Sequence, residues 1–169
     1  IELVIKELDL YLAKVPQLKT KPLKQIHLGG GSPTFFSSQA LAFLIDEIDK
    51  RVTRQKNHFE GAIEVDPRRT KRDQLVELKK RGFNRISLGV QDFDPEVQRL
   101  VNRIQPFEQT KQTTDWAREL GYESVNFDLI YGLAKQTPES IKKSAMLTID
   151  LKPDRIALYS LAIVPWIRP

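Results

Sequence analysis

Apolar residues recur through the first part of the chain with the spacing of one face of a helix. They are Ile1, Val4, Ile5, Leu8, Leu12 and Val15. Intervals of three or four residues bring side chains to the same side of an α-helix, and proline disrupts the interior of a helix. The pattern therefore predicts an amphipathic helix that ends near Pro16.

Short apolar stretches then alternate with helical patterns. A strand is predicted over 26–28, ahead of three consecutive glycines, and Ser37 or Ser38 is placed to cap the helix that follows. The sequence AIEVD, residues 62–66, predicts the next strand. Strand and helix signals thus occur in turn.

The next unit contains a pattern that begins a helix and a glycine that ends it. Thr70 and Asp73 have the spacing of a capping box, and the helix that they begin is expected to end at Gly82. The sequence RISLGVQ, residues 85–91, predicts the strand that follows.

Two further units continue the alternation. One helical pattern ends at Gly121, and Thr137 with Pro138 begins another. The sequences VNFDLIYGL, residues 125–133, and RIALYSLAIV, residues 155–164, predict the strands that follow these two helices.

The alternation predicts an α/β fold with a mainly parallel sheet, either a barrel-like (β/α) array or a doubly wound open sheet. Five predicted strands are too few for a closed barrel of about eight. No linker or low-complexity segment divides the chain, so residues 1–169 are expected to be one domain or part of one.

In three of the predicted strands, apolar and polar side chains alternate along the sequence. The residues of one face are Ile63, Val65, Ile86, Leu88, Val90, Val125, Phe127 and Leu129. The residues of the other face are Glu64, Asp66, Ser87, Gly89, Gln91, Asn126 and Asp128. Successive residues of a strand point to opposite faces, so the apolar set is expected to meet the helices.

The polar face of these strands is a candidate site. Glu64, Gln91 and Asp128 are expected to converge on the concave interior, near the carboxyl ends of the strands, where such folds keep their sites. The alternative is that Glu64 and Asp128 cap loops or accept backbone amide hydrogens.

The glycine turn over 29–31 matches neither common phosphate motif. No Gly-Lys-Ser/Thr follows it, and Phe35 occupies the last glycine position of a dinucleotide fingerprint counted from Gly29. Without side chains the turn can offer backbone groups to an amino-acid-like ligand, but it can also be a simple tight connection.

Composition and charge exclude several classes of protein. The chain is 40% hydrophobic and 29% charged, as in globular proteins, and has no apolar run of about 18 residues and no signal-peptide pattern. Its net charge of +5 is spread over several predicted helices, which favours a solvated surface over a nucleic-acid site. We therefore expect a cytoplasmic protein that binds neither membrane nor nucleic acid, and an acidic small-molecule substrate fits the charge.

The metal-ligating residue types are scarce. There is no cysteine, and His27 and His58 lack the spacing of metal ligands. We therefore predict no disulfide and no metal site within these residues.

Several motifs carry a resemblance to a known family. They are HLGGGSPT, AIEVDPR, RISLGVQDFDPEVQRLVNR, NFDLIYGLAKQTPES and PDRIALYSLAIVPW. In order and spacing they resemble segments of oxygen-independent coproporphyrinogen III oxidases, which are radical S-adenosylmethionine (radical SAM) enzymes. The resemblance spans nearly the whole chain and implies a partial TIM-like (β/α) barrel.

The resemblance also implies a reaction and its cofactors. A 4Fe-4S cluster reduces S-adenosylmethionine to methionine and a 5′-deoxyadenosyl radical, which removes hydrogen from a substrate propionate. Loss of carbon dioxide and one electron then leaves a vinyl group. Repeated at a second propionate, this converts coproporphyrinogen III into protoporphyrinogen IX in haem biosynthesis, with an external electron donor as partner.

The positions that match the family's motifs imply a cofactor-binding site, but they imply no catalytic residue. The implied cofactor-binding residues are Gly30, Gly31, Ser32, Glu64, Gln91, Arg103, Asp128 and Ala162. The glycines match the turn around the methionine part of S-adenosylmethionine, and Ala162 matches a backbone contact. The family accommodates two S-adenosylmethionine molecules, and the resemblance does not show which of the two each residue would contact. Arg103 can pair with a carboxylate bidentately, although it can also be a surface arginine after a short helix.

The family's CxxxCxxC motif, which holds the cluster, is absent together with the first barrel strand and the C-terminal region. Because the later motifs follow in order, we expect residues 1–169 to be a fragment of the radical SAM core domain, inactive alone. The cysteines that ligate the cluster would lie outside it, and an unpaired sheet edge would favour association.

Four residues depart from the usual family pattern. Ser32 replaces threonine, Ala134 replaces proline, and Leu161 and Ile163 replace tyrosine and histidine around Ala162. The last two changes would alter the active-site pocket, and they bear on the expected reaction more than on cofactor binding.

Two other functions stay open. Related haem chaperones share the barrel and the glycine turn, but they usually read VQSF where this chain has VQDF, and they lack its VNR. An unrelated (β/α) enzyme could use Glu64 and Asp128 as general acid and base without iron.

Overall fold

The alternating pattern forms a parallel sheet in the computed structural model, which describes residues 1–163. The helices are α1 (Glu2–Lys14), α2 (Ser38–Asp49), α3 (Arg72–Lys80), α4 (Pro95–Leu100), α5 (Phe107–Glu119) and α6 (Pro138–Asp150). The strands are β1 (Gln25–Leu28), β2 (Glu60–Val65), β3 (Phe83–Gln91), β4 (Ser124–Tyr131) and β5 (Arg155–Ser160). The short 3-10 helices are η1 (Pro16–Lys19) and η2 (Pro33–Phe35).

The last two strands are shorter than predicted. β4 ends at Tyr131, two residues before the predicted end, and β5 ends at Ser160, so that 161–163 are not strand. Position 164 of the predicted strand lies outside the described residues. No helix in the described part of the chain has the length and apolar character needed to cross a membrane.

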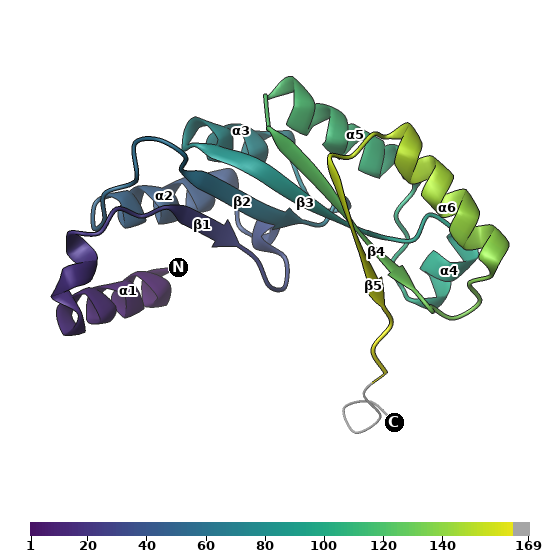
Figure 1. Cartoon of the computed structure of the whole chain (residues 1–169), viewed down its shortest axis with the longest axis horizontal. Coiled ribbons are helices and arrows are strands. Elements are labelled where there is room, and N and C mark those ends of the chain that lie inside the picture. Colours follow the sequence, from purple (N-terminus) through teal and green to yellow (C-terminus); the bar gives the residue numbers. More distant parts are fainter. Residues whose placement is uncertain (164–169) are drawn as a thin grey trace.

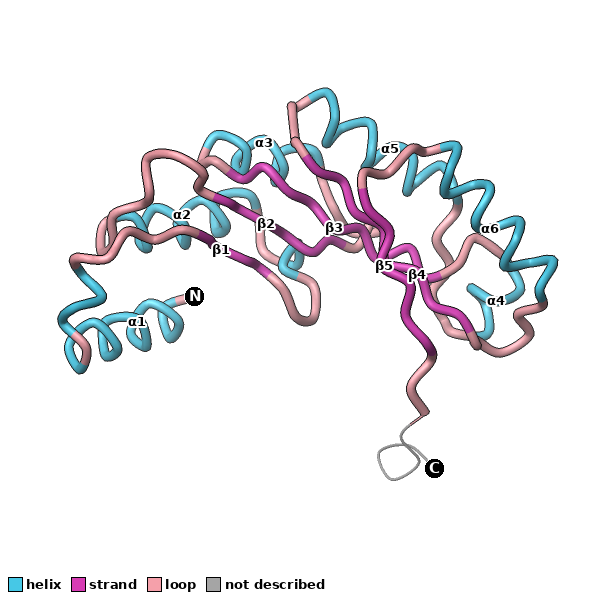
Figure 2. Tube along the Cα trace, viewed as in Figure 1, coloured by secondary structure: helices cyan, strands magenta, loops and turns pink. Residues whose placement is uncertain are grey.

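The five strands are hydrogen-bonded in chain order, and every neighbouring pair is parallel. Parallel strands need crossover connections, which the helices supply. Figure 1 shows α2, α3, α5 and α6 along the convex side of an arched sheet, and the tube in Figure 2 follows the same arch. Within residues 1–163, β1 and β5 each pair with a single strand, so the sheet is open and has the curvature of a partial barrel.

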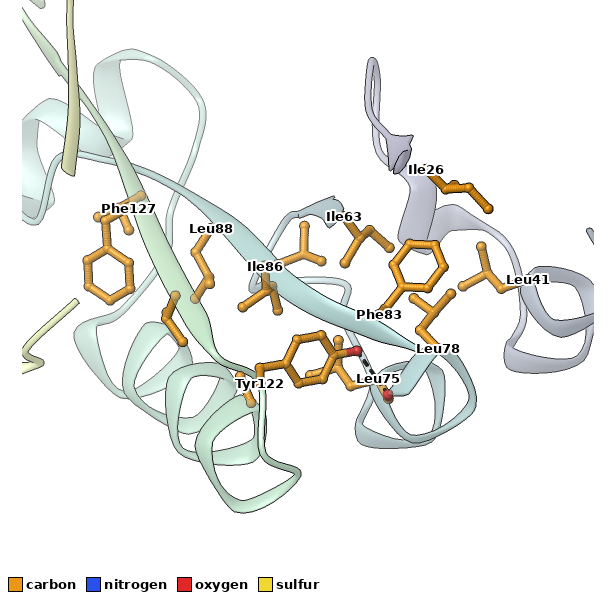
Figure 3. Packing of buried hydrophobic residues seen from close by; sticks show 14 of the residues in the cluster. Ile26, Leu41, Ile63, Leu75, Leu78, Phe83, Ile86, Leu88, Tyr122 and Phe127 are labelled. Atoms are coloured by element: carbon orange, nitrogen blue, oxygen red, sulfur yellow. Dashed lines mark hydrogen bonds between the residues drawn. The ribbon is translucent and has the colours of Figure 1, made fainter. Parts of the chain in front are cut away.

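The predicted separation of the two sheet faces is confirmed. Ile63, Leu88 and Phe127 have no exposed surface, whereas the neighbouring residues Glu64 and Asp128 are only partly buried. Figure 3 shows the buried side of the sheet against the adjoining helices. The labelled residues are Ile26, Leu41, Ile63, Leu75, Leu78, Phe83, Ile86, Leu88, Tyr122 and Phe127.

One buried polar group in this core is paired. The Tyr122 hydroxyl donates to the main-chain oxygen of Leu75 at 3.0 Å, which joins the turn before β4 to α3. Burial raises the pKa of Tyr122, so the hydroxyl keeps its proton and remains a donor.

Most predicted helix ends are confirmed. The Ser37 hydroxyl accepts a backbone N–H of α2 at 3.1 Å, and the Thr137 hydroxyl accepts one of α6 at 3.2 Å. Pro138 is the first residue of α6, and α3 and α5 stop just before Gly82 and Gly121.

The capping box predicted at Thr70 and Asp73 is wrong. The residue before α3 is Lys71, whose backbone N–H donates to Gln74 Oε1 at 2.7 Å. The Thr70 hydroxyl instead donates to the main-chain oxygen of Asp66 at 2.8 Å, and the Asp73 carboxylate accepts from a serine hydroxyl of α2. The turn after β2 therefore uses the threonine, and the helix begins one residue later than the box required.

Asp66 organises that turn. Its carboxylate accepts the Arg68 backbone N–H at 3.0 Å and the Arg68 guanidinium at 2.7–3.2 Å, and Arg103 Nη1 lies at 3.5 Å. Burial alone would raise the pKa of Asp66, but the hydrogen bonds from Arg68 and the charge of Arg103 outweigh it, so the pKa of Asp66 is lowered. The turn thus depends on an ionised carboxylate.

Phe83 tests the core. Phe83 is fully buried, whereas Phe35 is 76% exposed. Phe83→Ala is expected to lower the free energy of unfolding by roughly 3–5 kcal/mol, because it removes apolar contacts and leaves a cavity. The matched change Phe35→Ala is expected to shift it by less than about 0.5 kcal/mol. Denaturant unfolding checks both, and equal losses would contradict this view of the core.

Asp66 tests the turn after β2. A lowered pKa means that ionised Asp66 stabilises the fold at pH values above its unfolded pKa of about 4, and that this stability is lost as the pH falls through the lower folded pKa. Asp66→Asn is therefore expected to cost most stability at neutral pH, and the difference from the parent protein should shrink below about pH 4. Unfolding measured as a function of pH checks this. A difference that stays constant across this range would contradict the assignment.

Candidate functional site

The polar face of the strands lines a hollow on the concave side of the sheet, with a volume of about 280 Å³. Its polar lining residues are Gln25, His27, Glu60, Glu64, Arg85, Ser87, Ser124, Asn126, Asp128 and Tyr159. Glu64 and Asp128 are brought to the same hollow, as predicted. Gln91 is not part of its lining and lies further along, at the carboxyl end of β3.

Asp128 is held by neighbouring side chains of the sheet. Its Oδ2 accepts from the Ser87 hydroxyl at 2.8 Å, and its Oδ1 accepts from Asn126 Nδ2 at 2.8 Å. The Asn126 amide also donates to Ser87 Oγ at 2.7 Å. Both donors to Asp128 are neutral, so among the described residues the carboxylate is fixed in place without a cation to balance it. Such a group suits an ammonium or hydroxyl donor of a ligand.

Glu64 is joined to the glycine turn. Gly30 N donates to Glu64 Oε2 at 3.2 Å, and His27 Nε2 lies 3.0 Å from Glu64 Oε1. Glu64 and Gly30 are predicted from the sequence to belong to one site, and the hydrogen bond from Gly30 N joins them directly.

The turn itself leaves space above its backbone. Gly30 and Gly31 have φ angles of +74° and +50°, which favour glycine, and a Cβ at either position would have no neighbouring atom within 4 Å. Ser32 follows them half-buried, with its hydroxyl 3.4 Å from that of Thr34. Open space above glycine backbone allows close approach of a ligand.

Arg103 and Gln91 meet at Gly89. Arg103 Nη2 donates to the main-chain oxygen of Gly89 at 2.8 Å. A Cβ on Gly89 would lie 2.9 Å from Arg103 Nη2 and 3.2 Å from Gln91 Nε2, so both side chains occupy the space that glycine leaves. The strand register also shifts between Gly89 and Gln91, and Gln91 has a φ of +68°. The bulge therefore places the two side chains together.

The Arg103 guanidinium is partly unsatisfied. Its Nη1 lies 3.5 Å from Asp66, but its buried Nε has no hydrogen-bond partner among the described residues. Burial lowers the pKa of Arg103, and the Arg68 charge adds to this against the opposing effect of Asp66, yet a guanidinium remains protonated. Buried donors without partners are rare, so this one favours an acceptor supplied by a ligand.

Ala162 is the predicted residue that the structure joins least to the others. It lies two residues after β5 and is exposed. The Leu161 N–H donates to the main-chain oxygen of Tyr131 at 2.8 Å, which keeps this segment beside the end of β4. No hydrogen bond within residues 1–163 links Ala162 to Glu64, Arg103 or Asp128.

The binding residues predicted from the sequence do not include His27, Ser87 or Asn126. Each contacts one of the two carboxylates. Their positions could have identified them, because all three alternate with buried residues of their strands and so point to the polar face of the sheet.

A larger hollow lies elsewhere, between α2 and α3, with a volume of about 720 Å³. Its carboxylates are already paired, Asp46 with Arg81 at 2.7 Å and Asp73 with the Ser38 hydroxyl at 2.8 Å. It contains none of the predicted site residues, so size alone does not make it the candidate site.

Comparison with known proteins places this arrangement in a family. The Radical SAM superfamily model matches residues 3–148. The chain is 42% identical over 160 residues to the oxygen-independent coproporphyrinogen III oxidase of Helicobacter pylori strain J99, covering 95% of this chain and 35% of that protein. For the oxidase of the same name from Synechocystis the identity is 40% over 166 residues, covering 98% and 35%. The chain thus spans about a third of the length of the curated relatives it matches.

Solved structures agree in fold. Coproporphyrinogen III oxidase from Escherichia coli, described as a radical SAM enzyme, superimposes with a TM-score of 0.87 at 41% identity, covering 92% of this chain and 36% of that one. A radical S-adenosylmethionine methyltransferase from Kitasatospora setae has a TM-score of 0.72 at 14% identity, covering 92% and 31%, and shows the fold alone. These likenesses confirm the predicted partial barrel. Because the superfamily model covers most of its length, the chain belongs to the radical SAM superfamily.

Proposed function

We propose that the full-length protein is an oxygen-independent coproporphyrinogen III oxidase, which oxidatively decarboxylates two propionates of coproporphyrinogen III to give protoporphyrinogen IX. The observation that carries this proposal is 40–42% identity to proteins of that name over 91–98% of this chain. Since the chain spans about a third of those relatives, the activity is assigned to the whole protein. An external electron donor and a cytoplasmic location are parts of the same proposal.

The cofactor S-adenosylmethionine carries an α-ammonium and an α-carboxylate, and the candidate residues suit both. The Glu64 and Asp128 carboxylates are acceptors for an ammonium or for ribose hydroxyls. The buried Arg103 Nε is a donor that lacks a partner in residues 1–163, and a carboxylate would satisfy it. The open backbone at Gly30 and Gly31 allows close contact with the amino-acid part.

In this proposal the residues of the chain bind and orient the cofactor. Glu64 and Asp128 are fixed by hydrogen bonds before any ligand arrives, so little side-chain freedom is lost on binding. When bound, S-adenosylmethionine with a 4Fe-4S cluster supplies the one-electron chemistry that oxidises the propionate. The chain has no cysteine to hold that cluster, so we expect residues 1–169 alone to be inactive.

Turnover tests the proposed activity. The full-length protein, anaerobically reconstituted with its cluster, is expected to convert coproporphyrinogen III into protoporphyrinogen IX when given S-adenosylmethionine and a reductant. Chromatography of the oxidised porphyrins measures the product, and omission of S-adenosylmethionine is the control. Stable haem binding without product, at full cluster content, would contradict the oxidase and indicate a haem chaperone.

Calorimetric titration tests the cofactor site. In the reconstituted full-length protein, Arg103→Ala and Asp128→Ala are each expected to weaken S-adenosylmethionine binding by roughly tenfold or more, because each removes a charged hydrogen-bonding group. Arg99→Ala and Asp115→Ala are matched controls, since both side chains lie outside the site. Unchanged affinity in the two site variants would show that the residues are assigned wrongly.

A further inference from the structure

The Glu64 carboxylate is held from two directions by the chain segment that precedes α2. Gly30 N donates to Oε2 at 3.2 Å, and His27 Nε2 lies 3.0 Å from Oε1. A carboxylate oxygen only accepts hydrogen bonds, so this contact requires the proton of the imidazole to sit on Nε2. The strand β1 and the glycine turn therefore fix one oxygen each.

Gly29 lies between these two donors and leaves room for the His27–Glu64 pair. A Cβ on Gly29 would lie 2.6 Å from His27 Nε2 and 2.9 Å from Glu64 Oε1, and real Cβ atoms essentially never come that close. The His27–Glu64 contact thus occupies the space that the missing side chain of Gly29 leaves. Gly29 therefore makes room for the two side chains, whereas Gly30 and Gly31 leave open space above the backbone.

No other side chain of the described residues holds Glu64. In the β2–β3 register Glu64 lies opposite Ser87, but the Ser87 hydroxyl donates to Asp128 Oδ2 at 2.8 Å. Glu64 is 46% exposed, so packing alone does not fix its torsion angles. Without the imidazole, a single backbone N–H would hold a flexible side chain, which would then lose rotamer freedom on binding a ligand.

We propose that His27 is a positioning residue that orients the Glu64 carboxylate toward the cofactor. The inference rests on the proposed function, because the ligand in question is S-adenosylmethionine. His27 acts through Glu64: together with Gly30 N it occupies one lone pair on each carboxylate oxygen, which leaves the second lone pair of each oxygen for donors of the ligand. It therefore affects affinity only while Glu64 is present.

The test is a titration of the reconstituted full-length protein with S-adenosylmethionine by anaerobic calorimetry, so its readout is binding and not turnover. His27→Leu, which removes the donor, is expected to weaken binding roughly tenfold. His27→Gln is expected to retain most of the affinity, because its Nε2 lies as many bonds from Cβ as that of histidine. His27→Asn, one atom shorter, is expected to behave like His27→Leu. His58→Leu is the matched control, since His58 is exposed and outside the site.

A double-mutant cycle separates positioning from general destabilisation. In the Glu64→Ala background, adding His27→Leu is expected to change the affinity by less than about twofold, because the side chain through which it acts is removed. Equal loss in both backgrounds, or parent-like binding by His27→Leu, would overturn the inference while leaving the proposed function intact. Failure of the parent protein to bind S-adenosylmethionine would overturn the proposed function and this inference with it.

Discussion

The register of the three central strands is the constraint on which the rest of the structure depends. Ile63, Ile86 and Val125 lie side by side across β2, β3 and β4, and the next row begins with Glu64 opposite Ser87. A slip of one residue in any of these strands would exchange the two faces. Carboxylates would then face the helices, and isoleucines would line the concave hollow. Burial of the apolar rows therefore also determines where the polar site forms.

The site combines two kinds of support. Glu64 and Asp128 project from the middle of a sheet, where backbone hydrogen bonds on both sides hold the strand. Arg103 comes from the connection after α4 and is tied to the sheet through the main-chain oxygen of Gly89. The loop residue is thus anchored on a strand, but it is not among the residues that line the hollow with Glu64 and Asp128.

The regular features of the fold could be predicted from local sequence. Alternation within 62–66 and 85–91 identified the buried and polar faces, and the glycine stops and the Ser37 and Thr137 caps involve neighbours close in sequence. The capping box at Thr70 failed because a competing bond to Asp66 shifted the start of α3. That bond is itself local, since the two residues lie four positions apart, but the capping-box pattern does not consider the residues that precede the cap.

Contacts between strands were beyond the sequence patterns. The pairing of His27 with Glu64 depends on the β1–β2 register and on Gly29, and the meeting of Gln91 with Arg103 depends on the bulge after Gly89. Alternation along a strand assigns a residue to one face of the sheet, but it does not say which neighbouring residue it contacts there. The resemblance to a known family named Glu64 and Arg103, but it gave no reason for their positions, which the contacts supply.

Gly29 has a consequence for how this sequence can evolve. Any other amino acid there would place its Cβ against the ends of the His27 and Glu64 side chains, which would have to move to make room. Among descendants of this sequence, a substitution at Gly29 is therefore expected to be accompanied by a rearranged His27–Glu64 contact, although 37 positions separate the histidine from the glutamate.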